Sequence, residues 1–161
     1  MKEIIVSTLL LFAITLSIPF CKMNNSIKKY QSIEESMTEN TNPINGNKLK
    51  IKVGEKIFTA TILDNSTAKA FKALLPLTLN MEELNDNEKF AQLPKSMPTN
   101  ASVPASIQSG DLMMYGSSTF VLFYKSFSTD YSYTKIGKID DVSGLAAALG
   151  LGNVTVIFET E

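Results

Sequence analysis

The stretch GDLMMYG at residues 110–116 is the first of three consecutive blocks that decide the fold; FVLFY at residues 120–124 and YTKIGK at residues 133–138 follow it. Apolar and aromatic residues run through each block, and clusters of Gly, Ser and Thr separate the blocks from one another. Short β-rich runs punctuated in this way are typical of consecutive strands joined by turns. The sequence therefore predicts three neighbouring strands in this region.

Further strands are expected on both sides of these blocks. Leu49, Ile51 and Val53 alternate with lysines, which indicates a half-buried strand. Gly54-Glu55 then fits a two-residue hairpin loop of type II′, because Gly occupies the first turn position. Similar apolar patterns, most of them alternating, predict the other strands of the set, at residues 57–63, 77–81, 90–93 and 154–158.

Two short helices and several loops complete the expected organisation. The first helix begins at Asn65 or Ser66 and ends before Pro76, and the second begins at Asp140 or Asp141 and ends at Gly150 or Gly152. We expect a charged turn over residues 82–89 and a long surface loop over residues 95–109. About eight short strands and two helices within residues 48–161 predict a mainly β fold, a closed barrel with helices over its ends. A β-sandwich is the alternative.

The first 47 residues have a different character. Residues 4–16 are almost all apolar and follow Lys2, which predicts a signal peptide over residues 1–20. Cys21, the single cysteine, stands directly after it and resembles the lipid-modified residue of a bacterial lipobox. The polar residues 21–47 are then expected to form a flexible tether. We expect an exported protein of the bacterial cell envelope, lipid-anchored to a membrane at Cys21; a cleaved signal peptide that happens to contain a Cys is the alternative.

The composition excludes several kinds of chemistry. The chain contains no His, no Arg and no Trp, and its 15 cationic residues are all Lys. Nucleophile pairs with His and His-based metal sites are therefore impossible, and no guanidinium is present to bind phosphate with two parallel hydrogen bonds. A net charge of −1 makes a nucleic-acid partner improbable. We expect no cofactor, no metal and a monomer.

The order of blocks along residues 48–159 resembles the small bacterial branch of the cyclophilin-like β-barrels. The resemblance rests on the first hairpin and helix, the loop at 93–101, the three blocks above, the second helix and the last strand. True cyclophilins are peptidyl-prolyl isomerases with an aromatic and Met-lined pocket and an Arg that stabilises the twisted amide. Here only Lys125, Lys135 or Lys138 offers a nearby cation, and a Lys lacks the planar fork of Arg.

The apolar and aromatic residues of the three blocks are expected to be mostly core, since strand alternation turns only half of them to either face. Aromatic residues in or beside loops are better candidates for a binding groove. Local loop packing is the alternative reading of the same residues. We assign no catalytic residue, and the candidate groove comprises Phe90, Met97, Met114, Phe127, Tyr131 and Tyr133.

Acidic residues carry less information. Residues 82–88 are rich in Glu and Asp but lack the spacing of a calcium loop, so solvated turn charge is the better interpretation. Asp111 follows Gly110 and is expected to form a turn. The sequence thus predicts a module that binds a peptide or a small apolar ligand without covalent chemistry. A prolyl isomerase and a structural envelope lipoprotein are the two alternatives.

Overall fold

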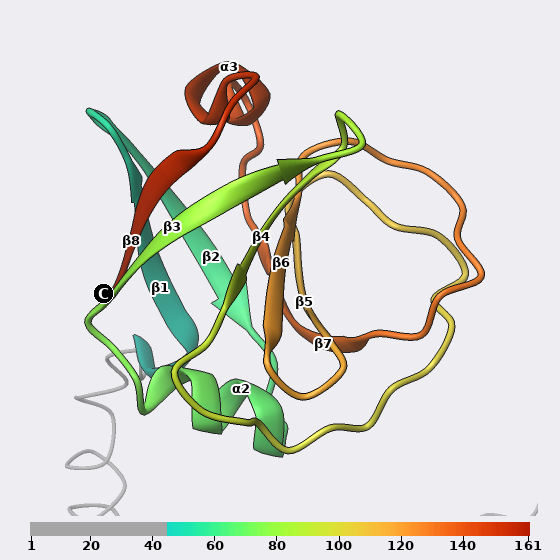
Figure 1. The fold of residues 1–161 in the computed structure, drawn as a ribbon. Helices are drawn as coiled ribbons and strands as arrows, with labels where there is room; N and C mark the ends of the chain where they lie inside the picture. Colours follow the sequence, from blue (N-terminus) through green and yellow to red (C-terminus); the bar gives the residue numbers. More distant parts are fainter. Residues whose placement is uncertain (1–44) are drawn as a thin grey trace, which may run out of the picture. The chain divides into compact units, whose positions relative to one another are not determined.

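Eight antiparallel strands close into a barrel in the computed structural model, which describes residues 45–161 (Figure 1). Around the barrel the strands follow the order β1-β2-β7-β5-β6-β4-β3-β8, and β8 pairs back with β1. The prediction of a closed, mainly β barrel is therefore confirmed. After the short 3₁₀ turn η1 (Asn45–Asn47), the strands are β1 (Lys48–Val53), β2 (Lys56–Ile62), β3 (Leu77–Leu84), β4 (Glu88–Gln92), β5 (Asp111–Tyr115), β6 (Thr119–Phe123), β7 (Thr134–Ile139) and β8 (Val154–Thr160).

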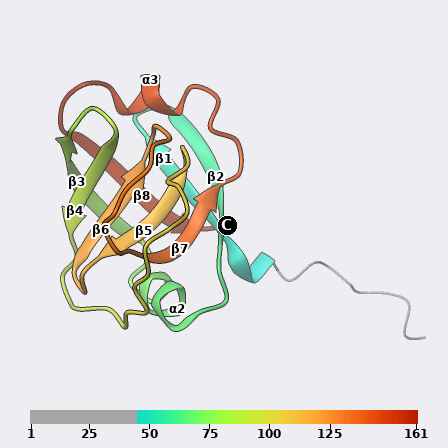
Figure 2. The ribbon, with the colours of Figure 1, turned by 90° about the vertical axis from the view of Figure 1, so that its right-hand side faces the viewer.

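The helices α2 (Ser66–Lys72) and α3 (Leu145–Leu149) lie at opposite ends of the barrel (Figures 1 and 2). Asn65 caps α2 as predicted, because its Oδ1 accepts a hydrogen bond of 2.8 Å from the Ala68 N–H. The predicted start of α3 at Asp140 or Asp141 was wrong, since the helix begins after Gly144. Asp140 is instead held by Lys48, whose Nζ lies 2.7 Å from its carboxylate.

The charged turn is shorter than predicted. Strand β3 continues to Leu84 and β4 already begins at Glu88, so only residues 85–87 connect them. Asn85 and Asp86 both adopt positive φ angles, 55° and 56°. Two adjacent residues with positive φ are the mark of the tight type I′ hairpin, which Asn and Asp tolerate better than most residues. The predicted turn over 82–89 is corrected accordingly.

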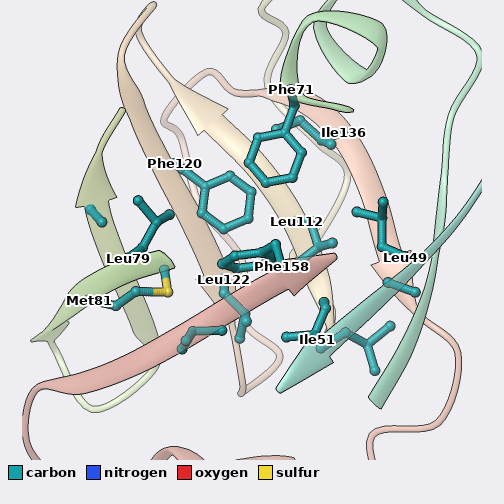
Figure 3. Packing of buried hydrophobic residues seen from close by; sticks show 14 of the residues in the cluster. Leu49, Ile51, Phe71, Leu79, Met81, Leu112, Phe120, Leu122, Ile136 and Phe158 are labelled. Atoms are coloured by element: carbon teal, nitrogen blue, oxygen red, sulfur yellow. The ribbon is translucent and has the colours of Figure 1, made fainter. Parts of the chain in front are cut away.

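Alternate side chains of all the strands point into the barrel and form its core (Figure 3). Three aromatic rings occupy its centre: Phe71 of α2 stacks on Phe120 of β6, and both meet Phe158 of β8 edge to face. All three residues are fully buried. Helix α2 is therefore bound to the barrel through an aromatic side chain that reaches into the core.

A buried lysine closes the other end of the barrel. Lys89 on β4 has no exposed surface, and its ammonium donates to the Glu83 carboxylate and to the carbonyl oxygens of Gly150 at 2.9 Å and Gly152 at 2.7 Å. Tyr124 donates a hydrogen bond of 2.9 Å to the same carboxylate. Burial opposes the charge on Glu83, but these hydrogen bonds outweigh it and lower the pKa of Glu83. The pair ties β3 and β4 to the connection between α3 and β8.

A second, smaller apolar cluster lies on the outside of the barrel. Two long loops, residues 93–110 and 124–133, run beside β4, β6 and β5, at the right in Figure 1. Beneath these loops, side chains from the outward faces of β5 and β6 are buried. The cluster consists of Ile107, Met113, Val121, Phe123 and Tyr133, and Phe90 and Phe127 pack against it. This outer face carries the candidate site.

The predicted signal peptide, the lipid-attachment residue Cys21 and nearly all of the predicted tether lie outside the described residues. Within residues 45–161, neither helix has the length and apolar character needed to cross a membrane.

Candidate functional site

A hollow of about 850 Å³ opens on the outer face of the barrel, between the strands and the loop at 124–133. Residues from the four strands β3, β4, β5 and β6, from the turn between β3 and β4, and from this loop surround it. They are Leu84, Asn85, Asn87, Glu88, Phe90, Gln92, Tyr115, Thr119, Val121, Phe127, Ser128, Thr129, Asp130, Tyr131 and Tyr133. We call this feature the outer groove.

Strand alternation determines which side chains form the floor of the outer groove. On β4 the inward residues Lys89 and Ala91 are buried in the barrel, so Glu88, Phe90 and Gln92 turn outward. In the same way, Thr119 and Val121 of β6 face outward. The floor is thus built on two hydrogen-bonded strands, whose pairing places Phe90 opposite Val121.

The wall of the outer groove is fixed by pairing between the two long loops. Ile107 and Phe127 exchange backbone hydrogen bonds of 2.9 and 3.2 Å, and Ser102 and Tyr133 exchange two of 3.0 Å. At the start of the loop at 124–133, the N–H of Tyr124 donates to the Asn87 carbonyl at 3.0 Å. These bonds hold both ends of the loop, so Phe127 and Tyr133 are positioned before any ligand arrives.

Aromatic rings form a continuous array along this wall. The Tyr115 ring meets the Tyr131 ring edge to face at 6.1 Å between centroids, and the Tyr133 ring at 5.7 Å. Tyr133 in turn packs against Phe123, at 5.5 Å, and Phe123 packs against Phe127, at 5.7 Å. Tyr115 and Tyr131 are 48% and 64% exposed, whereas Tyr133 is buried. The array therefore runs from the outer apolar cluster to solvent.

Glu88 is the unusual polar residue of the outer groove. Only 8% of the residue is exposed, and it lines the hollow, but its carboxyl oxygens are not among the enclosed side-chain atoms of residues 45–161 that lack a hydrogen-bond partner, which belong to Asn87 and Asp111. Burial, reinforced by the negative charge of Glu83, raises the pKa of Glu88 to about 7. Burial first and the nearby Glu88 second raise the pKa of Tyr133 to about 12. A carboxyl group with a raised pKa beside a group of tyrosine rings is therefore the unusual feature of the outer groove.

The charges around the outer groove have one sign. Its lining includes two carboxyl groups, on Glu88 and Asp130, and none of the lysines of residues 45–161. The cations considered from the sequence point elsewhere: Lys135 Nζ lies 3.1 Å from an oxygen of the buried Asp111, and Lys125 Nζ lies over the Tyr124 ring. Neither these two residues nor Lys138 lines the outer groove.

Four of the six candidate groove residues line the outer groove: Phe90, Phe127, Tyr131 and Tyr133. The placement of Met97 and Met114 is corrected, because both are buried in the core inside the barrel. On β5, Leu112 and Met114 face inward while Met113 faces outward, so the register of the strand removes Met114 from the groove.

Sequence reasoning missed Tyr115 and Glu88. Tyr115 was interpreted as core together with its apolar neighbours, but it ends β5 and faces outward. Its position before Gly116, at the turn, is the signal that would have placed it at a rim. Glu88 was grouped with solvated turn charge, and no local signal reveals its burial.

Two other polar features carry no chemistry of their own. Asp111 accepts a hydrogen bond of 2.9 Å from the backbone N–H of Gln108, which agrees with the predicted turn role. Within residues 45–161 no three acidic or cysteine side chains gather in a way that would hold a metal ion.

Comparisons with known proteins address the fold. The sequence model described as the cyclophilin-like family matches residues 51–159. The solution structure of the hypothetical protein AF2241 from Archaeoglobus fulgidus is similar at 15% identity and a TM-score of 0.48, over 71% of this chain and 94% of that one. No curated protein matches the sequence.

Proposed function

Because this chain belongs to the cyclophilin-like family, and because that barrel carries the outer groove, we propose that it is a binding module for a peptide or a small, largely apolar ligand. The observation that carries the proposal is the groove itself, a hollow of about 850 Å³ lined by five aromatic side chains. Ligand sites are typically concave and apolar, with a few polar groups that fix orientation. The volume falls within the range of about 300–1,000 Å³ that is usual for such sites.

The exposed part of the aromatic array supports binding rather than packing alone. Tyr115 and Tyr131 present large ring surfaces to solvent although apolar neighbours lie beside them. Rigid aromatic side chains contribute much contact area at a low entropic cost, which is why they are enriched in binding sites. The paired loops reduce this cost further, because the wall is already ordered.

Binding of the neutral apolar dye N-phenyl-1-naphthylamine to the full chain tests the proposal. We expect its fluorescence to rise with a saturable profile, and the double variant Phe127→Ala/Tyr131→Ala to weaken binding about tenfold. Leu151→Ala is the matched control, because Leu151 is 87% exposed but lies outside the outer groove. Equal binding by all three proteins, or none by the wild type, would contradict the proposal and favour a purely structural role.

The aromatic lining also fits the isomerase alternative, which is tested separately. Lowering a barrier of about 20 kcal/mol to peptide-bond rotation needs an apolar pocket and a positioned donor. The groove offers the first, and the amide groups of Asn87 and Gln92 are donors at its edge. A proline-peptide isomerisation assay at high concentrations of the full chain decides the matter: a rate equal to the uncatalysed one eliminates this alternative.

We propose in addition that the chain is exported and lipid-anchored in the bacterial cell envelope. Its apolar leader and the position of Cys21 support this. Incorporation of labelled fatty acid into the expressed protein tests it. We expect the label to be lost in Cys21→Ala and retained in the neighbouring control Ser26→Ala; an unlabelled wild type overturns the anchor.

A further inference from the structure

We propose that the ligand of the outer groove carries an organic ammonium group, whose positive charge is bound by the Glu88 carboxylate and the faces of Tyr115, Tyr131 and Tyr133. This inference rests on the proposed binding function and names the chemical class of the ligand. It follows from three features of the described residues: the single sign of the groove charges, the partly buried carboxylate of Glu88 and the arrangement of the tyrosines.

The charges of the outer groove are the first argument. Two carboxyl groups and no lysine line it, so its field attracts cations and repels anions. The protein elsewhere pairs its buried charges. Lys89 has three acceptors and Asp111 has Lys135, whereas the ion pairs of residues 45–161 do not include Glu88. The Glu88 carboxylate lines the hollow and is partly buried, so a bound cation would pair with it where water screens the attraction less than at the surface.

The tyrosines are the second argument. A cation over an aromatic face is attracted by the electron-rich ring, and groups of such rings are the usual way in which proteins bind alkylated ammonium ions. Tyr115, Tyr131 and Tyr133 adjoin each other with centroid separations of 6.1 and 5.7 Å, and two of the rings are inclined by 89°. Inclined neighbouring rings form a corner rather than a flat surface. Glu88 lines the same hollow as the three tyrosines, so the carboxyl group and the corner belong to one site.

The polar residues at the rim are the third argument. Asn85, Asn87 and Gln92 line the same hollow and present amide groups, while Ser128 and Thr129 present hydroxyl groups. Such groups suit the hydroxyl or carbonyl end of a small polar ligand whose ammonium end is held by the aromatic corner. Gln92 already donates to Thr119 Oγ1 at 2.9 Å, and Thr129 Oγ1 accepts from the Tyr131 N–H at 3.1 Å. The buried Oδ1 of Asn87, in contrast, has no hydrogen-bond partner among the described residues, and a purely hydrocarbon ligand would leave it without one. The occupant is therefore a small molecule with a charged ammonium end and a neutral polar end.

A comparison of two probes of equal shape tests the charge requirement. Choline carries a quaternary ammonium, and 3,3-dimethylbutan-1-ol replaces its nitrogen with a neutral carbon. We expect amide chemical-shift titrations of the full chain to give about tenfold tighter binding of choline, with shifts at Glu88, Tyr115 and Tyr131. In Glu88→Gln this preference is lost, because the affinity for choline falls while that for the neutral alcohol does not. Glu55→Gln, in the hairpin between β1 and β2, is the matched control and retains it.

A second variant separates the aromatic contribution from that of Glu88. Tyr131→Leu keeps an apolar side chain at a position that is 64% exposed, so the variant should fold normally. We expect it to weaken the binding of choline about threefold or more. Equal binding of the two probes, or binding of the neutral dye without choline, overturns this inference and leaves the proposed groove function intact. Failure of the dye as well removes the proposed function itself.

Discussion

The ring of Phe71 stacks on the ring of Phe120 with their centroids 4.8 Å apart and their planes 8° from parallel. Phe71 belongs to α2 and Phe120 to β6, so this contact joins a helix at one end of the barrel to the strand that forms the floor of the outer groove. Both side chains are fully buried. The stacking therefore fixes α2 to β6, one of the two strands beneath the outer groove.

Phe71→Ala should destabilise the protein by about 3–5 kcal/mol, the usual cost of removing a buried phenylalanine ring and leaving a cavity. Guanidinium unfolding monitored by circular dichroism gives the free energy. Phe71→Leu, which keeps most of the volume, is expected to lose clearly less. Similar losses for both variants would show that ring stacking, rather than volume, dominates at this position.

Alternation made most of the barrel predictable from sequence. Leu49, Ile51 and Val53 are all buried, and the lysines between them are not, as the pattern required. The closure of the sheet is not visible in such patterns, because it depends on which strands pair. The pairing of β2 with β7, over 70 residues apart in sequence, is an example. For that reason the prediction of a closed barrel rested on the order of the sequence blocks along residues 48–159, and not on the pattern of any one strand.

The pairing of β2 with β7 requires a residue without a side chain at Gly137. A Cβ atom at this position would lie 2.5 Å from the Thr61 carbonyl oxygen and 2.9 Å from the Ile62 Cα, both backbone atoms of β2. Gly137→Ala should therefore separate β2 from β7 and cost about 1–3 kcal/mol or more, as overpacking does. Gly152→Ala is the control, because its Cβ meets nothing within 4 Å. Thermal unfolding of both variants checks this; a Gly137→Ala midpoint equal to that of the control would contradict the close approach.

The buried Lys89 explains why the turn predicted over residues 82–89 was too long. Charged residues at 82–89 predicted a turn, because hydrophobic periodicity cannot register a lysine that faces a barrel interior. Its ammonium is satisfied by Glu83 and two carbonyl oxygens that come from residues over 60 positions away. Such compensation exists only in three dimensions, so a local pattern cannot reveal it.

Lys89→Met should destabilise the protein by about 3 kcal/mol, because it leaves the Glu83 charge and two carbonyl oxygens without their donor. Urea unfolding of Lys89→Met, Glu83→Gln and the double variant measures the coupling. We expect the double variant to lose less than the sum of the single losses. Lys95→Met, at an exposed position, is the control. Strictly additive losses would mean that the pair contributes no coupling.

The sequence indicated which residues line the outer groove only where their position in a loop determined their exposure. Phe127 and Tyr131 lie in a loop and line the outer groove, whereas the position of Met114 depended on which face of β5 points inward. A shift of one residue along a strand exchanges its faces, and nothing in the β5 sequence, DLMMY, distinguishes Met113 from Met114. Glu88 was missed for the related reason that burial of a charged residue depends on tertiary contacts, which a local pattern does not record.

Glu88 makes stability depend on pH in a specific direction. Its pKa is about 7 in the folded protein against an ordinary value of 4.5, so between these values the folded state holds more protons than the unfolded state. Stability therefore falls as pH rises through this window. The charge of Glu83, whose pKa is lowered, acts on Glu88 from the neighbouring strand, and the other titratable groups of the hollow are those of Tyr115, Asp130, Tyr131 and Tyr133.

Glu88→Gln removes this titration and should leave stability almost unchanged at pH 4.5 but raise it by on the order of 1–3 kcal/mol at pH 8, since each pKa unit corresponds to about 1.4 kcal/mol. Chemical unfolding of both proteins at several pH values gives the difference curve. Leu151→Ala, which changes no titratable group at an exposed position, is the control and should give a difference curve that does not depend on pH. A Glu88→Gln difference that is the same at every pH would show that the carboxyl group ionises normally.

The pH dependence of choline binding connects this titration to the proposed ligand. Choline keeps its charge at every pH, so any change in affinity arises from the protein. Since the ionised form of Glu88 is the one that attracts a cation, we expect the affinity to fall by about tenfold or more between pH 8 and pH 5.5, with a midpoint near 7. Isothermal titration at matched ionic strength measures this, and proton release on binding near pH 7 is a second readout. The profile should flatten in Glu88→Gln; an unchanged profile in that variant would assign the titration to another group and separate Glu88 from the recognition of the cation.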